Sequence, residues 1–290
     1  MSATVQDHGP DPTPSAGAAV PAGTMLGPRL QVLGLLHEGH RITVYDAWDD
    51  GRDCRVVAKA LRPDHAGDRQ GARQLRSEGR LLAALTHPHV VRHYDTLRTP
   101  DPVVVLETLP GHTVDALLDE HERLALPDVL HLGLQLCSAI GYLHRSGWLH
   151  LDVKPANVIA DGGGRAKLID LSIARRPGPG VPGLGTRGYL PPEQAVGGVL
   201  GPAADVWGIG GLLYECLAGE PARPVSPGTQ TAPGGPGSRE AALVPSVPLR
   251  RRRRVPLPVA SLVDGMLDLD PDRRPDVSTC VAGLREALGG

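Results

Sequence analysis

The chain has 290 residues, with 30 basic and 32 acidic side chains and a formal net charge of −2. This near balance gives no argument for nucleic acid or an anionic membrane as an obligate partner, and we expect neither. Apolar residues make up 41% of the chain, so its length suits one two-lobed domain or two small domains with substantial cores.

The cysteines and the apolar runs indicate the cellular compartment. Cys54, Cys137, Cys216 and Cys280 lie far apart and form no C-x-x-C pair, which favours reduced thiols in a cytoplasmic protein. No run of about 18 apolar residues occurs, so we expect no membrane-spanning helix. The sequence does not indicate an oligomeric state.

Residues 1–28 are rich in proline, glycine, alanine, serine and threonine and contain few large apolar side chains. Such a segment buries too little apolar surface to offset the entropy lost on ordering it. We therefore predict a disordered tail over residues 1–28 and a folded domain from residue 29.

Short strand patterns dominate the first half of the domain. Residues 42–45 and 55–59 are β-branched runs, and the turn-forming sequence Asp49-Asp50-Gly51 separates them. Residues 103–106 form another apolar run, whereas residues 75–85 carry leucines at helical spacing. This half therefore predicts a small sheet and one helix.

Helical patterns dominate the second half. Pro127 suits the first turn of a helix, and residues 204–217 form a strongly apolar helix that ends near Gly219. Residues 221–258 are rich in proline and glycine and predict an irregular insert. The last helices are expected between residues 259 and 288.

The most informative stretch reads His150-Leu151-Asp152-Val153-Lys154-Pro155-Ala156-Asn157, followed by Lys167-Leu168-Ile169-Asp170. It sets an acid, a cation, an amide and a second acid at fixed spacing. Phosphoryl transfer from a nucleotide needs such a set, because one carboxylate orients the attacking hydroxyl and a cation offsets charge on the moving phosphate. The amide oxygen and the second carboxylate then hold magnesium.

This order resembles the catalytic loop and metal-binding aspartate of eukaryotic-like bacterial Ser/Thr protein kinases, and the resemblance extends over about residues 30–288. It implies an α+β bilobal fold, with a small β-rich N-lobe over residues 29–109 and a larger, mainly helical C-lobe over residues 110–288. It also implies that ATP binds in the cleft and that its γ-phosphate is transferred to serine or threonine hydroxyls of proteins.

The resemblance assigns the catalytic groups residue by residue. Lys59, in a strand that matches V-A-I-K, would contact the α and β phosphates of ATP, with Glu78 as its anionic partner. Asp152 would orient the substrate hydroxyl and accept its proton. Lys154 would offset charge on the γ-phosphate. The magnesium ligands would be Asn157 and Asp170.

The same resemblance places the nucleotide base and four supporting residues. Adenine would bind to backbone groups of the hinge, which includes Glu107 and Leu109, with Leu106 as the gatekeeper. The base would be sandwiched by three apolar side chains, and one glycine would remain in the phosphate-covering loop: Val44, Ala58, Ile159 and Gly39. The supporting residues would bind the catalytic loop or brace the C-lobe: Thr186, Glu193, Asp205 and Arg274.

Two departures from the family pattern keep a second function open. The family's G-x-G-x-x-G aligns with residues 37–42, where only Gly39 is a glycine, and D-F-G becomes Asp170-Leu171-Ser172. Both changes favour the alternative of a pseudokinase, a nucleotide-binding or scaffolding module. A third possibility is a small-molecule kinase of the aminoglycoside type. Such kinases share H-x-D and the distal Asp, but they do not usually carry the Lys154-Pro155 pair.

Leu151 replaces the arginine that receives an activation-loop phosphate in the family. Between Ile173 and Gly185 the segment contains no serine, threonine or tyrosine, so no phosphate acceptor occurs there. We therefore expect activity that does not depend on phosphorylation of this loop.

Two charged clusters are open to other interpretations. His87, His89 and His93 could suggest a metal site, but no cysteine or carboxylate is placed to complete a coordination set. The run Arg250–Arg254 reads as a solvated linker, with a docking patch for an acidic partner as the minority interpretation.

Overall fold

The computed structural model describes residues 19–223 and 244–289, and it divides into two compact units. Unit 1 contains the described residues up to Gly79 together with Tyr94–Thr108, and unit 2 contains Arg80–His93 and the described residues from Leu109 onward. The predicted N-lobe spans residues 29–109, whereas residues 80–93 and Leu109 belong to unit 2. Most of the predicted insert, residues 224–243, lies outside the described residues.

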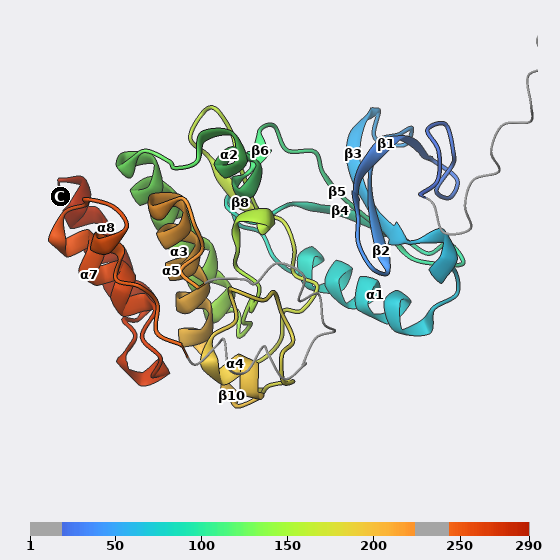
Figure 1. Cartoon of the computed structure of the whole chain (residues 1–290). Coiled ribbons are helices and arrows are strands. Elements are labelled where there is room, and N and C mark those ends of the chain that lie inside the picture. Colours follow the sequence, from blue (N-terminus) through green and yellow to red (C-terminus); the bar gives the residue numbers. More distant parts are fainter. Residues whose placement is uncertain (1–18, 224–243, 290) are drawn as a thin grey trace, which may run out of the picture. The chain divides into compact units, whose positions relative to one another are not determined.

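Unit 1 is built on a five-stranded sheet with the strand order β1-β2-β3-β5-β4 (Figure 1). Its strands are β1 (Leu30–Glu38), β2 (Ile42–Asp49), β3 (Cys54–Leu61), β4 (His93–Leu97) and β5 (Val103–Glu107). A 3-10 turn (Pro63–His65) leads from β3 to the helix α1 (Arg69–Ala83). The predicted sheet and single helix are confirmed, and the runs 42–45, 55–59 and 103–106 all lie in strands.

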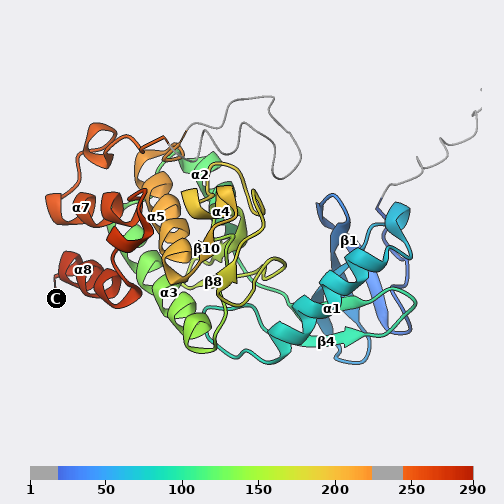
Figure 2. The same ribbon diagram turned by 90° about the horizontal axis from the view of Figure 1, so that it is seen from below.

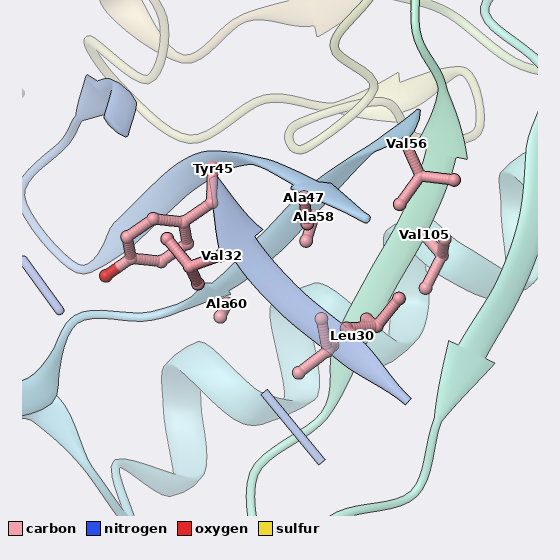
Figure 3. Close-up of a cluster of buried hydrophobic side chains, with 9 residues drawn as sticks. Leu30, Val32, Tyr45, Ala47, Val56, Ala58, Ala60 and Val105 are labelled. Carbon is pink, nitrogen blue, oxygen red and sulfur yellow. The ribbon is translucent and has the colours of Figure 1, made fainter. Parts of the chain in front are cut away.

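One face of this sheet carries a cluster of buried apolar side chains (Figure 3). The members lie on alternate positions of neighbouring strands, as the period of two in a strand requires: Leu30, Val32, Tyr45, Ala47, Val56, Ala58, Ala60, Val103 and Val105. The opposite face carries Lys59, which bonds to Glu78 of α1. The cluster therefore lies on the face away from α1 and needs another cover.

Part of the segment predicted to be a tail supplies that cover. Ala19, Val20 and Leu26 pack against the cluster, and the Val20 N–H donates to the Tyr45 hydroxyl at 3.2 Å. The predicted tail boundary is therefore wrong for residues 19–28, because their few apolar side chains have an open apolar sheet face to pack on. Residues 1–18 lie outside the described part of the chain.

Unit 2 is mainly helical. Its α-helices are α2 (Val114–His121), α3 (Leu126–Arg145), α4 (Pro192–Val196), α5 (Pro202–Ala218), α7 (Leu257–Met266) and α8 (Val277–Leu288). In α3, Pro127 lies in the first turn as predicted, and Gly219 ends α5 with a left-handed φ of 79°. Figure 2 shows α3 and α5 side by side, and α8 packs on α3.

Short strands and turns connect these helices. The strands β6 (His112–Thr113), β7 (Val158–Ala160) and β8 (Ala166–Leu168) form one small sheet, and β9 (Gly178–Pro179) pairs with β10 (Val199–Leu200). Three 3-10 turns complete the unit: Pro155–Asn157, Leu249–Arg251 and Pro271–Arg273. No helix among the described residues is both long and apolar enough to span a bilayer.

Candidate active site

Lys59 and Glu78 form a buried ion pair in unit 1. The Lys59 Nζ lies 2.7 Å from the Glu78 Oε1, and the two residues are 8% and 4% exposed. Lys59 comes from β3 and Glu78 from α1, so the pair ties the helix to the sheet. Because the pair is shielded from water, removing either partner would leave the other as an uncompensated buried charge. The structure therefore brings together the lysine and the glutamate that the sequence predicted as partners.

The sheet register corrects one predicted base contact. Ala58 is 0% exposed and lies in the apolar cluster (Figure 3). Successive side chains of a strand point to opposite faces, so Val57 and not Ala58 shares the face of Lys59. Val44 pairs with Lys59 across β2 and β3 and lies on that same face. The assignment of Ala58 as an adenine contact is therefore wrong.

Gly39 occupies the turn between β1 and β2. Its N–H donates to the carbonyl oxygen of Ile42 at 2.9 Å, and a Cβ atom on residue 39 would lie 2.9 Å from that same oxygen. The turn therefore requires a glycine for reasons of space. Of the hinge residues, Glu107 ends β5 opposite Val56. Leu109 belongs to unit 2, where the predicted base contact Ile159 lies on β7.

Asp205 of α5 holds the backbone of the predicted catalytic loop, residues 150–157, in unit 2. Its carboxylate accepts the N–H groups of His150 at 2.9 Å and Leu151 at 2.7 Å. The same carboxylate lies 2.8 Å from Nε2 of His144 on α3. Because Asp205 is 1% exposed, these bonds form away from water and fix the loop to the helix. The predicted anchoring role of Asp205 is confirmed, and His144 is a further partner that the sequence did not indicate.

The two carboxylate oxygens of Asp152 have different surroundings. Oδ2 accepts from Nδ2 of Asn157 at 2.9 Å and lies 2.9 Å from Nζ of Lys154. Oδ1 is buried and has no hydrogen-bond partner among the described residues. One oxygen therefore orients the carboxylate, and the other is left to accept a hydrogen bond from a bound group.

Lys154 connects the catalytic loop to the segment that follows Asp170. Its ammonium group donates to Oγ1 of Thr186 at 2.5 Å and also contacts Asp152. An ammonium has three N–H donors. The two bonds therefore leave one donor for an anion, and the predicted contact between Lys154 and Thr186 is confirmed.

Asn157 and Asp170 present oxygen atoms that suit a magnesium ion. The Nδ2 of Asn157 donates to the backbone and side chain of Asp152, which leaves its Oδ1 oxygen for another partner. The Ile169 N–H donates to the backbone carbonyl oxygen of Asn157 at 3.1 Å, which places the next residue, Asp170, near Asn157. Oδ1 of Asp170 accepts the Ser172 N–H at 2.8 Å. Amide and carboxylate oxygens are the donors that magnesium prefers, so these two residues fit the ion.

Leu151 has a strained backbone and a buried side chain. Its φ is 67°, a left-handed value that is costly for a leucine, and the residue is 6% exposed. The side chain packs in an apolar cluster with Leu149, Leu200, Ala204 and Ile173. The Leu151 carbonyl oxygen also accepts from Nε2 of Gln194 at 2.8 Å. The position that holds an arginine in the family which this loop resembles is therefore filled by an apolar side chain. No sequence pattern indicated the role of Gln194.

His150, next to Leu151, is neutral in the folded chain. Complete burial lowers the pKa of its imidazole, and this effect outweighs the neighbouring carboxylates. Its Nδ1 accepts the Asp152 N–H at 3.2 Å, which the neutral ring permits. His150 therefore positions Asp152 without adding charge to the loop.

Glu193 and Arg274 form the ion pair that the resemblance predicted. The two guanidinium nitrogens of Arg274 donate to the two carboxylate oxygens at 2.7 and 2.8 Å. The guanidinium group also lies 4.8 Å from the ring centre of Trp207. This bidentate pair joins α4 to the turn before α8 and braces the second unit.

Histidines 87 and 89 have ordinary structural partners. The ring of His87 stacks on Tyr142 at 5.0 Å, and Nδ1 of His89 lies 2.8 Å from the carbonyl oxygen of Ala166. Within residues 19–223 and 244–289 there is no group of three or more histidine, cysteine or acidic residues that could hold a metal ion.

Comparison with known proteins gives matches over most of the chain. The family model described as "Protein kinase domain" matches residues 30–283. A protein of Streptomyces coelicolor named "Probable serine/threonine-protein kinase" is 34% identical over 208 residues, which are 68% of this chain and 31% of that protein. The serine/threonine-protein kinase PrkC of Bacillus subtilis is 32% identical, over 68% of this chain and 31% of its own length.

The serine/threonine-protein kinase PknB of Mycolicibacterium smegmatis is 33% identical over 239 residues, which are 77% of this chain and 37% of that protein. The chain thus spans about a third of the length of these three curated relatives. The family match over residues 30–283 covers every residue of the candidate site.

Proposed function

Because the chain belongs to the protein kinase domain family, we propose that it transfers the γ-phosphate of Mg-ATP to serine and threonine hydroxyls of proteins. The observation that carries this proposal is the arrangement around Asp152. One carboxylate oxygen is held by Asn157 and Lys154, and the other is buried and open to a substrate hydroxyl. A general base needs this combination of fixed orientation and a free acceptor atom.

Each residue then has a defined task. The open Oδ1 of Asp152 accepts the hydrogen bond of the acceptor hydroxyl and turns its oxygen toward the phosphate. The remaining donor of Lys154 offsets charge on the γ-phosphate as it moves. Lys59, held by Glu78, contacts the α and β phosphates. Asn157 and Asp170 would hold magnesium, which neutralises phosphate charge when bound.

One of the predicted contacts with the adenine base, Ala58, has to be replaced. On unit 1 we assign the apolar contacts to Val44 and Val57, because both lie on the face of the sheet that carries Lys59. On unit 2 we assign Ile159. The backbone groups of Glu107 and Leu109 remain the proposed hydrogen-bond partners of adenine.

The contact between Lys154 and Thr186 supports serine and threonine as acceptors. It belongs to the pattern that the resemblance associates with Ser/Thr kinases, and its short distance of 2.5 Å fixes both side chains. The pseudokinase alternative has less support, because the residues proposed for phosphate binding and proton transfer make ordered contacts within their own units.

Phosphate transfer from labelled Mg-ATP, to the chain itself and to a generic basic protein, tests the proposal. We expect transfer by the unchanged chain and a loss of about 10²- to 10⁴-fold in kcat for Asp152→Asn, which removes the base but keeps the shape of the side chain. Phosphoamino-acid analysis should give phosphoserine or phosphothreonine. A folded chain that binds ATP but transfers nothing with any divalent metal would instead support the pseudokinase.

A further inference from the structure

The outer face of α1 carries a row of arginines. Arg69, Arg73 and Arg76 are all exposed, and their spacing of four and then three residues places them on one side of the helix. Arg80 continues the row with the same spacing. None of these four positions is part of the machinery proposed for phosphate transfer.

Arg69 and Arg73 are like charges four residues apart on the first turns of the helix, a spacing at which they repel one another. Asp68 directly precedes the helix, and its carboxylate accepts the Gln70 N–H at 2.9 Å, so the positive charge of the helix start is already offset. An anion bound beside Arg69 and Arg73 would relieve the repulsion between them.

A hollow in the surface of unit 1 gathers three of these arginines. Its volume is about 400 Å³, and it is lined by Gly67, Arg69, Ala72, Arg73, Arg76, Pro100 and Asp101. The Asp101 carboxylate accepts the Gly67 N–H at 3.0 Å, so part of its charge is already engaged. Three guanidinium groups and one carboxylate give the lining a formal charge of +2. Arg69 and Arg73 form no ion pair with another residue that the structure describes.

We propose that this hollow binds the phosphate of a phosphorylated serine or threonine in a protein segment. Such a phosphate carries a charge of about −1.5 to −2 at neutral pH, which matches the charge of the lining, and its oxygens suit the fork of a guanidinium group. A nucleic acid or a membrane is disfavoured as the partner, because the chain has a net charge of −2.

The position of the hollow gives this binding a consequence. Arg76 and Glu78 lie two residues apart on α1, and Glu78 holds Lys59 at 2.7 Å. A phosphopeptide bound to the outer face would stabilise α1 and thereby favour the paired state of Lys59. This consequence rests on the proposed function, whereas the binding itself does not.

The binding is tested on the full chain carrying Asp152→Asn, which prevents the protein from phosphorylating itself or the probe. The probe is a fluorescein-labelled peptide with one phosphothreonine, followed by fluorescence anisotropy at low salt. We expect saturable binding that weakens as salt rises, and at least about a tenfold loss of affinity for Arg69→Gln/Arg73→Gln. Because both side chains are exposed, this variant should fold, which its thermal midpoint checks.

The matched control is Arg250→Gln/Arg251→Gln, which removes the same charge from two exposed arginines of the run Arg250–Arg254. It should leave the affinity unchanged. An equal loss in both variants would overturn the proposal, because it would show attraction to net charge only. Equal binding of a threonine or glutamate version of the peptide, or preferential binding to phosphatidylserine vesicles or duplex DNA, would overturn it as well.

Failure of this site is distinguishable from failure of the proposed function. Peptide binding by the Asp152→Asn chain does not require phosphate transfer. If transfer occurs and no phosphopeptide binds, only the inference about the hollow fails.

Discussion

Leu151 shows at the scale of a single residue how the catalytic loop is held without a phosphate. Where the family has an arginine that receives a phosphate, this chain has a leucine that is 6% exposed and packs with Ile173 and Leu200. Ile173 lies near the start of the segment that runs from Asp170 to Glu193, and Leu200 lies in β10, shortly after that segment ends. One apolar cluster therefore connects the loop around Leu151 to both ends of this segment. Apolar contact can therefore replace the ion pair that a phosphate would form.

Replacing Leu151 tests this view. The variant Leu151→Arg would bury a charge with no counterion in the cluster, and we expect it to lower the free energy of unfolding by about 3 kcal/mol or more. Leu151→Met, which keeps the volume, should cost less than about 1.5 kcal/mol. Urea unfolding measures both. In parallel, phosphatase treatment of the unchanged chain should not reduce its activity, and a large reduction would contradict phosphate-independent activity.

At the scale of elements, α5 is the support on which the catalytic loop rests. Asp205 bonds to the loop backbone, and one turn later Gly208 lies against Val153. A Cβ atom at residue 208 would be 2.9 Å from the Val153 Cβ and 3.1 Å from its carbonyl oxygen. The glycine therefore allows the close approach of loop and helix on which the position of Asp152 depends.

Two alanine substitutions in α5 separate this packing from helix propensity. Gly208→Ala should displace the loop, with a cost of about 1–3 kcal/mol in stability and about a 10- to 100-fold loss in kcat. Gly211→Ala is the matched control, because the nearest atom to its Cβ would be 3.7 Å away, an ordinary contact. It should leave kcat unchanged and stabilise the helix by up to about 1 kcal/mol. Equal kinetics of the two variants would refute the supporting role of α5.

The same scale shows what could be predicted from the sequence. The two strands around Asp49-Asp50-Gly51 and the helix that ends at Gly219 have strong local signals, and both occur as predicted. The face on which Ala58 lies was predicted wrongly. Successive side chains of a strand point to opposite faces of the sheet, and a match to a sequence motif does not show which face each apolar residue occupies. The packing of residues 19–28 could not be predicted, since it depends on a sheet face built by distant strands.

At the scale of the whole molecule, the candidate groups are divided between the two units. Unit 1 holds the proposed phosphate contact Lys59 with Glu78, and unit 2 holds the catalytic loop with Asp152 and Lys154. Each set is held within its own unit by ion pairs and hydrogen bonds. The motif of the catalytic loop was readable because its members are close in the sequence, whereas the partner of Lys59 lies 19 residues away and was inferred from the resemblance.

This division predicts that substitutions in the two units affect different steps. Glu78→Gln removes the carboxylate that lies 2.7 Å from a buried Lys59, so the lysine loses the charge that orients it. We expect ATP affinity to fall about tenfold or more, with a loss of about 3 kcal/mol in the stability of unit 1. Asp152→Asn leaves the phosphate contacts in place and should change ATP affinity by less than about twofold while transfer is lost. Calorimetric titration with Mg-ATP measures both affinities. If Asp152→Asn weakened ATP binding as much as Glu78→Gln, nucleotide binding would not be separable from the catalytic loop, and the assignment of the two tasks to the two units would fail.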